Sequence, residues 1–301
     1  MSRVSIVTAA YNPGEHLRAT VDSVKAQTFT DWMWHIVDDG SKEDLSWVID
    51  ADKRIIYERI ENRGPAGARN RGIEQSAGEL IAFVDADDVW APHKLARQVA
   101  VFDSKVETGL VYTQFDRIDG AGGLLAEGFA TPIEGFEDLL TGCMMLTSSV
   151  MLRRSGLAGV SLFDERFRGP EDWDFFLRYL RSNQCVFLPE VLVHYRQTAG
   201  SLCRQTDSMY QQSKKVVHEH LRWARQNHRG LAAIKALEGE RILRTKYAGF
   251  RFDIARESYR QRAYRDAVQG VIIVAREAPW FVVKSLMAHL SVGFSRKQKA
   301  E

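Results

Sequence analysis

Four segments of the chain carry side chains whose types and spacing could do chemistry. The first is DADD at residues 85–88, where carboxylates two residues apart follow an apolar run. Residues two apart on a strand point to the same side, so Asp85 and Asp87 can present their carboxylates together. Paired carboxylates repel unless a cation joins them, and hard oxygen ligands suit Mn²⁺ or Mg²⁺, which also bind diphosphate oxygens. An acidic turn capping a helix at Pro92 is the alternative, but the position after a buried strand favours a metal site.

The second and third segments could bind a phosphorylated ligand. Residues 38–41, DDGS, end another apolar run and by themselves are typical of a turn with an Asp or Ser helix cap. Residues 62–72, NRGPAGARNRG, place glycines and three arginines around a helix start, where free N–H groups and guanidinium groups could bind phosphate. A plain loop before a solvated helix fits them too. The segment lacks the P-loop and GxGxxG spacings, so neither of those nucleotide-binding motifs follows.

The fourth segment is EDWDFF at residues 171–176, which follows Gly169-Pro170 and is expected to begin a helix. Acids in a first helical turn usually complement the helix dipole. A carboxylate at a helix start beside aromatic side chains can also serve as a general base. The segment therefore offers a candidate base, with helix capping as the alternative.

The elements that must position these segments follow from hydrophobic periodicity. Apolar runs alternate with helical patterns in the first half, which predicts βαβ units and a mostly parallel sheet with ligands at the carboxyl ends of its strands. We expect strands at 4–9, 32–37, 55–60, 79–84, 110–115, 148–152 and 186–195. We expect helices around 17–28, at 65–76, from Pro92, and at 171–181, 205–227, 231–258, 260–276 and 280–294.

Composition limits the classes of protein to which the chain can belong. Its 301 residues are 45% hydrophobic, 27% charged and 10% aromatic, which is typical of a globular protein and excludes wholesale disorder. Three widely separated cysteines without CxxC spacing argue against a disulfide framework or a cysteine zinc site. The short apolar run at the N-terminus argues against a signal peptide, and no run of eighteen apolar residues predicts a membrane span. We therefore expect a cytoplasmic protein.

Charge divides the chain into two parts. Residues 1–203 carry 21 Lys and Arg against 30 Asp and Glu, whereas residues 204–301 carry 20 against 9, a net charge of +11. The basic, helical second part is expected to be a separate layer whose partners are anionic, such as phosphates or lipid head groups. Scattered arginines and the lack of a recognisable module argue against nucleic-acid binding.

Together the motifs resemble family 2 of the inverting glycosyltransferases, which have the GT-A fold. The resemblance covers about residues 3–200, through VSIVTAAYN, IVDDGS, NRGPAGARNRGI, GELIAFVDADDVW and GPEDWDFFLR in that order. It implies a mixed, mostly parallel sheet flanked by helices over residues 1–203, with a helical region at 204–301. It also implies transfer of a sugar from a nucleotide-diphosphate donor to an acceptor hydroxyl.

The resemblance also assigns residues to roles. By analogy the nucleotide and donor site contains Thr8, Ala9, Tyr11, Asp39, Arg69, Asp85, Ala86 and Glu171. Asp39 would bind the nucleobase. Asp85 and Asp87 would hold Mn²⁺ or Mg²⁺, and Asp172 would be the catalytic base. Many relatives have a histidine in a YRxH pattern, where this chain has Thr198; His194 precedes Tyr195 and is not a simple replacement.

The end of the chain suggests a second kind of partner. On a helix, Trp280, Val283, Leu286, Met287, Leu290 and Phe294 gather on one side, followed by three cations. Such a helix could lie on the inner face of a membrane, near a lipid-linked acceptor, or pack on the body or in a homodimer.

We expect a UDP-type donor and a glycan or lipid-linked glycan acceptor. The alternatives are a non-catalytic sugar-nucleotide or membrane-surface binding relative of this fold, and a nucleotidyltransferase, which would ordinarily carry a glycine-rich triphosphate loop.

Overall fold

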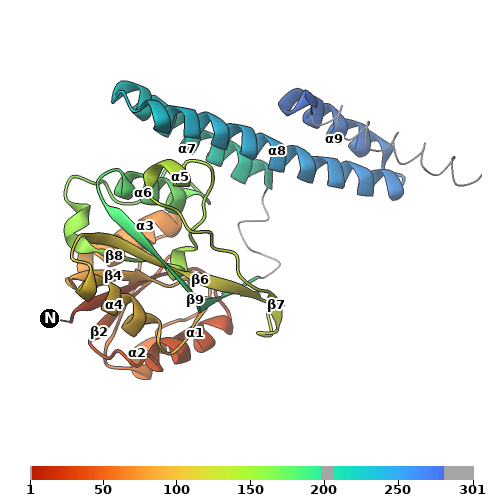
Figure 1. Ribbon diagram of the computed structural model, residues 1–301. Coiled ribbons are helices and arrows are strands. Elements are labelled where there is room, and N and C mark those ends of the chain that lie inside the picture. Colours follow the sequence, from red (N-terminus) through yellow and green to blue (C-terminus); the bar gives the residue numbers. More distant parts are fainter. Residues whose placement is uncertain (1, 198–205, 281–301) are drawn as a thin grey trace, which may run out of the picture.

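Nine strands form one mixed sheet in the part of the chain that the computed structural model describes, residues 2–197 and 206–280 (Figure 1). Their order is β3-β2-β1-β4-β8-β6-β9-β5, and β7 pairs with β6. The bounds are β1 Val4–Ala10, β2 Trp32–Asp38, β3 Ile55–Arg59, β4 Leu80–Phe83, β5 Val89–Trp90, β6 Thr108–Ile118, β7 Leu124–Ala126, β8 Met151–Arg153 and β9 Gln184–Arg196.

The helices form layers on both sides of this sheet. Figure 1 shows α1, α2 and α4 on one side and α3, α5 and α6 on the other, with α7 and α8 lying outside α5 and α6. The bounds are α1 His16–Lys25, α2 Val48–Ala51, α3 Gly64–Gln75, α4 Lys94–Ser104, α5 Phe136–Leu139, α6 Glu171–Leu180, α7 Thr206–Gln226, α8 Gly230–Arg260 and α9 Tyr264–Glu277, with 3₁₀ turns η1 at Thr147–Ser149 and η2 at Arg154–Leu157.

The sheet direction decides where the acidic segments meet. Strands β1 to β4 run parallel to one another, and β8 is antiparallel to both β4 and β6. Because parallel strands end at the same edge, the residues after β1, β2 and β4 come together there. The predicted parallel sheet and the placing of Asp39 and Asp85 at strand ends are thereby confirmed.

Period-two patterning puts the central strands between two cores. In β4, Leu80 and Ala82 pack with α1 and α4, while Ile81 and Phe83 pack with α3 and α6. Fully burying a side chain such as Phe83 contributes about 1.5–3 kcal/mol. Helix α3 lies close to β1, because a Cβ on Gly72 would meet Val7 Cγ1 at 2.6 Å. These two cores hold the strand ends and the start of α3 in place.

One predicted strand is wrong in its first half. The expected strand at 148–152 is a 3₁₀ turn at Thr147–Ser149 followed by the short strand β8. The run of serines and valine has strand-like composition, but the Ser149 N–H bonds to the Leu146 carbonyl and closes a turn instead. Smaller differences are that α4 begins at Lys94 and that β9 is longer than expected.

The C-terminal helices dock on α5 and α6. A Cβ on Gly239 of α8 would lie 2.1 Å from the Leu140 carbonyl oxygen, so α8 approaches the end of α5 very closely. His220 of α7 is buried, with Nε2 lying 3.0 Å from the Asp174 carboxylate of α6 and Nδ1 lying 3.0 Å from Arg181.

No helix within residues 2–197 and 206–280 is long and apolar enough to cross a membrane. The expected helix at 280–294 falls almost wholly outside the described residues.

This docking makes a pH prediction. Arg181 can only donate, so His220 Nδ1 accepts and Nε2–H donates to Asp174; the ring is neutral, and burial lowers its pKa. The unfolded chain takes up this proton near the ordinary histidine pKa of about 6.5, so stability falls as pH drops through that value. Thermal unfolding of His220→Gln should show a smaller loss of Tm between about pH 7.5 and 5.5 than wild type. The exposed His228→Gln is the control, and an unchanged slope in His220→Gln would contradict the prediction.

Candidate active site

The acidic segments meet the starts of two helices at one edge of the sheet. Residues 85–88 follow β4, and Glu171 and Asp172 open α6. Arg69, in the second turn of α3, lies between them with a side chain that is only 7% exposed. Its Nη2 donates to Asp85 and its Nη1 to Glu171, both at 2.8 Å. The candidate metal segment and the candidate base segment are thus joined through one buried guanidinium.

Charge–charge attraction keeps Arg69 ionised at this position. Burial opposes its charge, but the nearby carboxylates of Asp85 and Glu171 outweigh burial and raise its pKa. Breaking such a buried pair leaves an uncompensated charge. Glu171 is further fixed by the Gly169 N–H, which donates to it at 2.8 Å. Arg69 and Glu171 were both expected in the nucleotide site, and their bonds connect the start of α6 to the loop after β4.

The two carboxylates predicted to hold a metal fit that chemistry. Both are half-buried, and the side chain of Asp85 is 28% exposed. Burial and the repulsion of Asp85 raise the pKa of Asp87 to about 6. The two carboxylates therefore still repel each other in this structure. A divalent cation would relieve that repulsion. In the described part of the chain, no group of three or more His, Cys, Asp or Glu side chains could hold a metal, so diphosphate oxygens would have to complete the coordination.

The third aspartate of the segment has a different role. Asp88 is fully buried, accepts from the Ser148 hydroxyl, and accepts from the Arg196 N–H at 3.0 Å. Burial and the neighbouring carboxylates raise its pKa well above the usual range. Arg196 also donates from Nε to the Asp87 carbonyl at 2.9 Å. Asp88 and Arg196 therefore fix the loop that carries the candidate ligands.

Asp172 has the environment of a general base. It is half-buried, and burial together with the charge of Glu171 raises its pKa to about 7, against the opposing effect of Arg69. Its Oδ2 accepts from the Thr147 hydroxyl at 2.9 Å, and its Oδ1 accepts from the Trp173 N–H at 2.6 Å. A carboxylate with a pKa near neutrality can take a proton from a hydroxyl group.

The aromatic residues beside the base belong to the core. Trp173 is buried and its Nε1 donates to the Leu139 carbonyl at 2.8 Å. Phe175 stacks on Phe163 with ring centroids 4.2 Å apart. The rings therefore anchor the first turn of α6, and the carboxylate of Asp172 is left at its edge.

Four of the residues predicted for the nucleotide lie at the ends of β1 and β2: Thr8 and Ala9 in β1, Tyr11 just after it, and Asp39 just after β2. Asp39 is buried, and its carboxylate accepts from the N–H groups of Arg63 at 2.7 Å and Gly64 at 2.9 Å, where α3 begins. Burial nevertheless raises its pKa. Gly64 has a φ of +80°, a conformation that favours glycine, and this brings its N–H onto Asp39. The start of α3 is thus held by an acid from another strand.

The β1 residues differ in what they can offer a ligand. The Thr8 hydroxyl is buried, donating to the Val84 carbonyl at 2.7 Å and accepting from Trp34 Nε1 at 2.9 Å. Thr8 as a whole is 0% exposed, so it supports the end of β1 from inside and presents no atom to a ligand in this structure. Tyr11 is 55% exposed at the end of the strand, and Ala9 is half-buried. Ala86, between the two candidate ligands, is buried.

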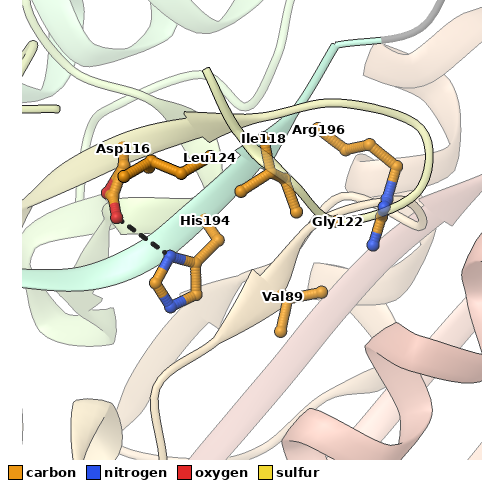
Figure 2. A pocket seen from close by; sticks show the side chains of 7 residues that line it. All are labelled: Val89, Asp116, Ile118, Gly122, Leu124, His194 and Arg196. Atoms are coloured by element: carbon orange, nitrogen blue, oxygen red, sulfur yellow. Dashed lines mark hydrogen bonds and ion pairs between the residues drawn. The ribbon is translucent and has the colours of Figure 1, made fainter. Parts of the chain in front are cut away.

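A hollow of about 340 Å³ lies beside the acidic loop (Figure 2). Figure 2 shows His194 and Asp116 joined at one side of it, with Nδ1 and Oδ2 3.2 Å apart, and Arg196 at the other side. His194 is held against the carboxylate of Asp116 on the neighbouring strand. This pairing gives His194 a structural role in joining two strands. Thr198 lies outside the described residues.

Sequence reasoning assigned no role to Thr147, Ser148 or Arg196, which bond directly to the acidic residues. Arg196 stands in the Tyr195-Arg196 pair that the sequence brought to attention. Ser148 begins the segment that was expected to be a strand, and Thr147 directly precedes it, so neither hydroxyl stood in a motif that indicated a role.

Comparison with known proteins agrees with this geometry. The sequence profile described as Glycosyl transferase family 2 matches residues 5–155. An Escherichia coli enzyme named UDP-Glc:alpha-D-GlcNAc-diphosphoundecaprenol beta-1,3-glucosyltransferase WfaP is 31% identical over 210 residues, 67% of this chain and 80% of its own. Four further relatives, all named uncharacterized glycosyltransferases, match over 25% to 68% of their own length.

Two solved structures share the fold at low sequence identity. S. aureus TarS 1-349 in complex with UDP-GlcNAc aligns with a TM-score of 0.61 and 15% identity, covering 88% of this chain and 89% of TarS. The Pyrobaculum calidifontis mannosyltransferase PcManGT in complex with GDP-Man and Mn²⁺ aligns with a TM-score of 0.59 and 16% identity, covering 97% and 81%. The fold and the sequence agree: the chain belongs to glycosyl transferase family 2, the inverting glycosyltransferases with the GT-A fold that use nucleotide-sugar donors.

Proposed function

We propose that this glycosyltransferase moves a hexose from a UDP-type donor to a hydroxyl of a glycan or lipid-linked glycan, with Asp172 as general base. The observation that carries the proposal is the buried Arg69, which bonds to Asp85 on one side and to Glu171 beside Asp172 on the other. A donor diphosphate at Asp85 would thereby lie next to an acceptor at Asp172. The relative WfaP, named as a UDP-Glc:alpha-D-GlcNAc-diphosphoundecaprenol glucosyltransferase, supports this choice of substrate class.

Asp85 and Asp87 would hold a divalent cation, Mn²⁺ or Mg²⁺, which neutralises charge on the departing diphosphate. Support comes from the raised pKa of Asp87 beside Asp85 and from the structure of PcManGT, which was solved in complex with GDP-Man and Mn²⁺. Asp39, Ala9 and Tyr11 would line the nucleotide pocket at the ends of β1 and β2. Thr8 would support this pocket from inside the sheet, because the residue is 0% exposed and its hydroxyl is already bonded.

The reaction follows from the two sides of this site. The acceptor oxygen forms a bond to the anomeric carbon as the bond from that carbon to the diphosphate oxygen breaks. Attack opposite the leaving group inverts the configuration. The acceptor's proton passes to the Asp172 carboxylate, which the Thr147 hydroxyl and Trp173 N–H hold at the edge of α6. The products are the glycosylated acceptor and a nucleoside diphosphate.

A donor panel tests the proposal. Release of nucleoside diphosphate from UDP-, GDP- and dTDP-sugars is measured with Mn²⁺, with and without a diphosphate-lipid-linked sugar acceptor. We expect the fastest release with a UDP-sugar and acceptor together. Nucleotide binding without any release would point instead to a non-catalytic sugar-nucleotide binding relative.

We further propose that residues 1–203 form the catalytic domain and that the basic region at 204–301 attaches it to anionic lipid. This rests on the net charge of +11 and on the apolar pattern from Trp280 to Phe294. Deleting residues 280–301 should abolish sedimentation with phosphatidylglycerol vesicles at low salt and leave donor hydrolysis largely intact. If the full-length protein does not sediment with these vesicles, the segment belongs to the body or to a dimer interface.

A further inference from the structure

The turn η1, Thr147–Ser149, contacts both acidic segments at once. The Thr147 hydroxyl donates to Asp172 Oδ2 at 2.9 Å. The next side chain, Ser148, donates its hydroxyl to Asp88 and accepts from the Asp85 N–H at 2.9 Å. Two consecutive hydroxyls therefore bond to the base segment on one side and to the metal-binding segment on the other.

Buried side chains fix this turn from behind. Trp90 Nε1 donates to the Ser148 carbonyl at 2.9 Å, and Gln98 Nε2 donates to the Ser149 carbonyl at 2.9 Å. The buried Lys94 amine in turn donates to Gln98 Oε1 at 2.8 Å. A shift of the turn would break the bonds from Trp90 and Gln98 and would leave the buried Trp90 N–H without its partner, so these side chains hold the turn in place.

We propose that η1 is a positioning element, in which the Thr147 hydroxyl orients the carboxylate of Asp172 and the Ser148 hydroxyl holds the loop that carries Asp85 and Asp87. This rests on the proposed role of Asp172 as base. The carboxylate has its two oxygens held by different groups, Oδ1 by the Trp173 N–H and Oδ2 by Thr147. Without Thr147 it could rotate away from an acceptor hydroxyl, and misplacement of a catalytic group costs rate.

The hydroxyl also acts on the ionisation of the base. The charged groups facing Asp172 are Glu171 on its own helix and Arg69 from α3, while Thr147 is the neutral donor from η1. A hydrogen bond donated to a carboxylate stabilises its charged form and lowers its pKa. Removing the Thr147 hydroxyl should therefore raise the pKa of Asp172 and move the acidic limb of the pH–rate profile to higher pH.

The test compares Thr147→Val with Thr147→Ser and with Thr141→Val. Thr147→Val keeps the shape of the side chain and removes the hydroxyl, so we expect kcat to fall about tenfold. The acidic limb of the pH profile of kcat/KM should move to higher pH by about one unit, and the KM for the donor should stay unchanged. Thr147→Ser should restore both values. Thr141→Val loses a hydroxyl that donates only to the Asp138 carbonyl, and should behave like wild type.

The second arm of the turn has its own readout. Ser148→Ala should weaken binding of UDP with Mn²⁺, measured by calorimetry, and leave the acidic limb in place. Should Thr147→Val fail to fold, Thr147→Ala removes the same hydroxyl without filling its place and is measured in the same way.

The outcomes separate the two proposals. A wild-type rate and acidic limb in Thr147→Val, together with an inactive Asp172→Asn, would overturn the positioning role and leave the proposed function standing. Full activity in Asp172→Asn would mean that the proposed base itself is wrong. A lower rate in Thr147→Val with an unmoved acidic limb, not restored by Thr147→Ser, would reduce the turn to a structural part of the fold.

Discussion

Replacing Asp172 by asparagine is expected to lower turnover by about 10² to 10⁴-fold, the usual contribution of a general base. Asparagine has almost the same shape, and its carbonyl oxygen can still accept a hydrogen bond, but it cannot take the acceptor's proton. Because the pKa of Asp172 is raised to about 7, wild-type activity should fall as pH drops below that value, where the carboxyl binds its own proton. The acidic limb should disappear from whatever activity remains in the variant. Steady-state rates at saturating donor and acceptor, over a pH series, measure both effects.

Two variants serve as controls for this experiment. Asp103→Asn makes the same change at an exposed ion pair with Arg3 and should leave the rate unaltered. Glu171→Gln should lose less turnover than Asp172→Asn. Glu171 acts through its bonds to Arg69 and Gly169, and its substitution leaves the proton acceptor in place. A near wild-type rate in Asp172→Asn would contradict the assignment. Loss of activity that arises only from lost nucleotide binding would contradict it equally.

The second large effect is expected at the metal site. Asp87→Ala should lower the Mn²⁺-dependent affinity for UDP by roughly 100-fold or more, because removing a ligand costs at least as much as removing a group that only orients one. The backbone carbonyl of Asp87 accepts a hydrogen bond from Arg196 Nε, and alanine keeps that carbonyl. The fold should therefore survive. Calorimetric titration of UDP with and without Mn²⁺ measures the metal-dependent part directly.

The matched control is again a surface aspartate, Asp103→Ala. Its Mn²⁺-dependent binding of UDP should equal that of wild type. If Asp87→Ala binds UDP with an unchanged dependence on Mn²⁺, the cation is held elsewhere or is not needed for binding. Thermal unfolding of both variants distinguishes a lost ligand from a damaged fold.

Much of the architecture was predictable from local patterns. The alternation of Val4, Ile6 and Val7 between two cores, and the helical spacing of Leu17, Val21 and Val24, are period-two and period-3.6 signals that each segment carries alone. Parallel strands end at one edge, so the sequence also predicts that acids after β2 and β4 lie there. The strand at 148–152 was wrong in its first half, because the backbone bonds that close η1 are invisible in composition.

The sequence also identified the acidic groups of the candidate site through the types and order of their residues. Asp85, Asp87 and Asp172 stand in motifs that resemble a known family, and the roles assigned to them stay predictions. What no local pattern carried was the connection between them. Arg69 was expected near a nucleotide, and its bonds to Asp85 and Glu171 depend on how α3 packs against β4 and α6.

The sequence by itself thus determined most of the strands, most of the helices and the chemical types at the site, since these depend on neighbours within a few residues. The tertiary structure alone decided which of these groups touch. Thr147 and Asp172 are 25 residues apart in the chain, and Ser148 and Asp88 are 60 apart. Such contacts arise from the packing of the sheet between its two cores, so the raised pKa of Asp172 could be found only after the chain was folded.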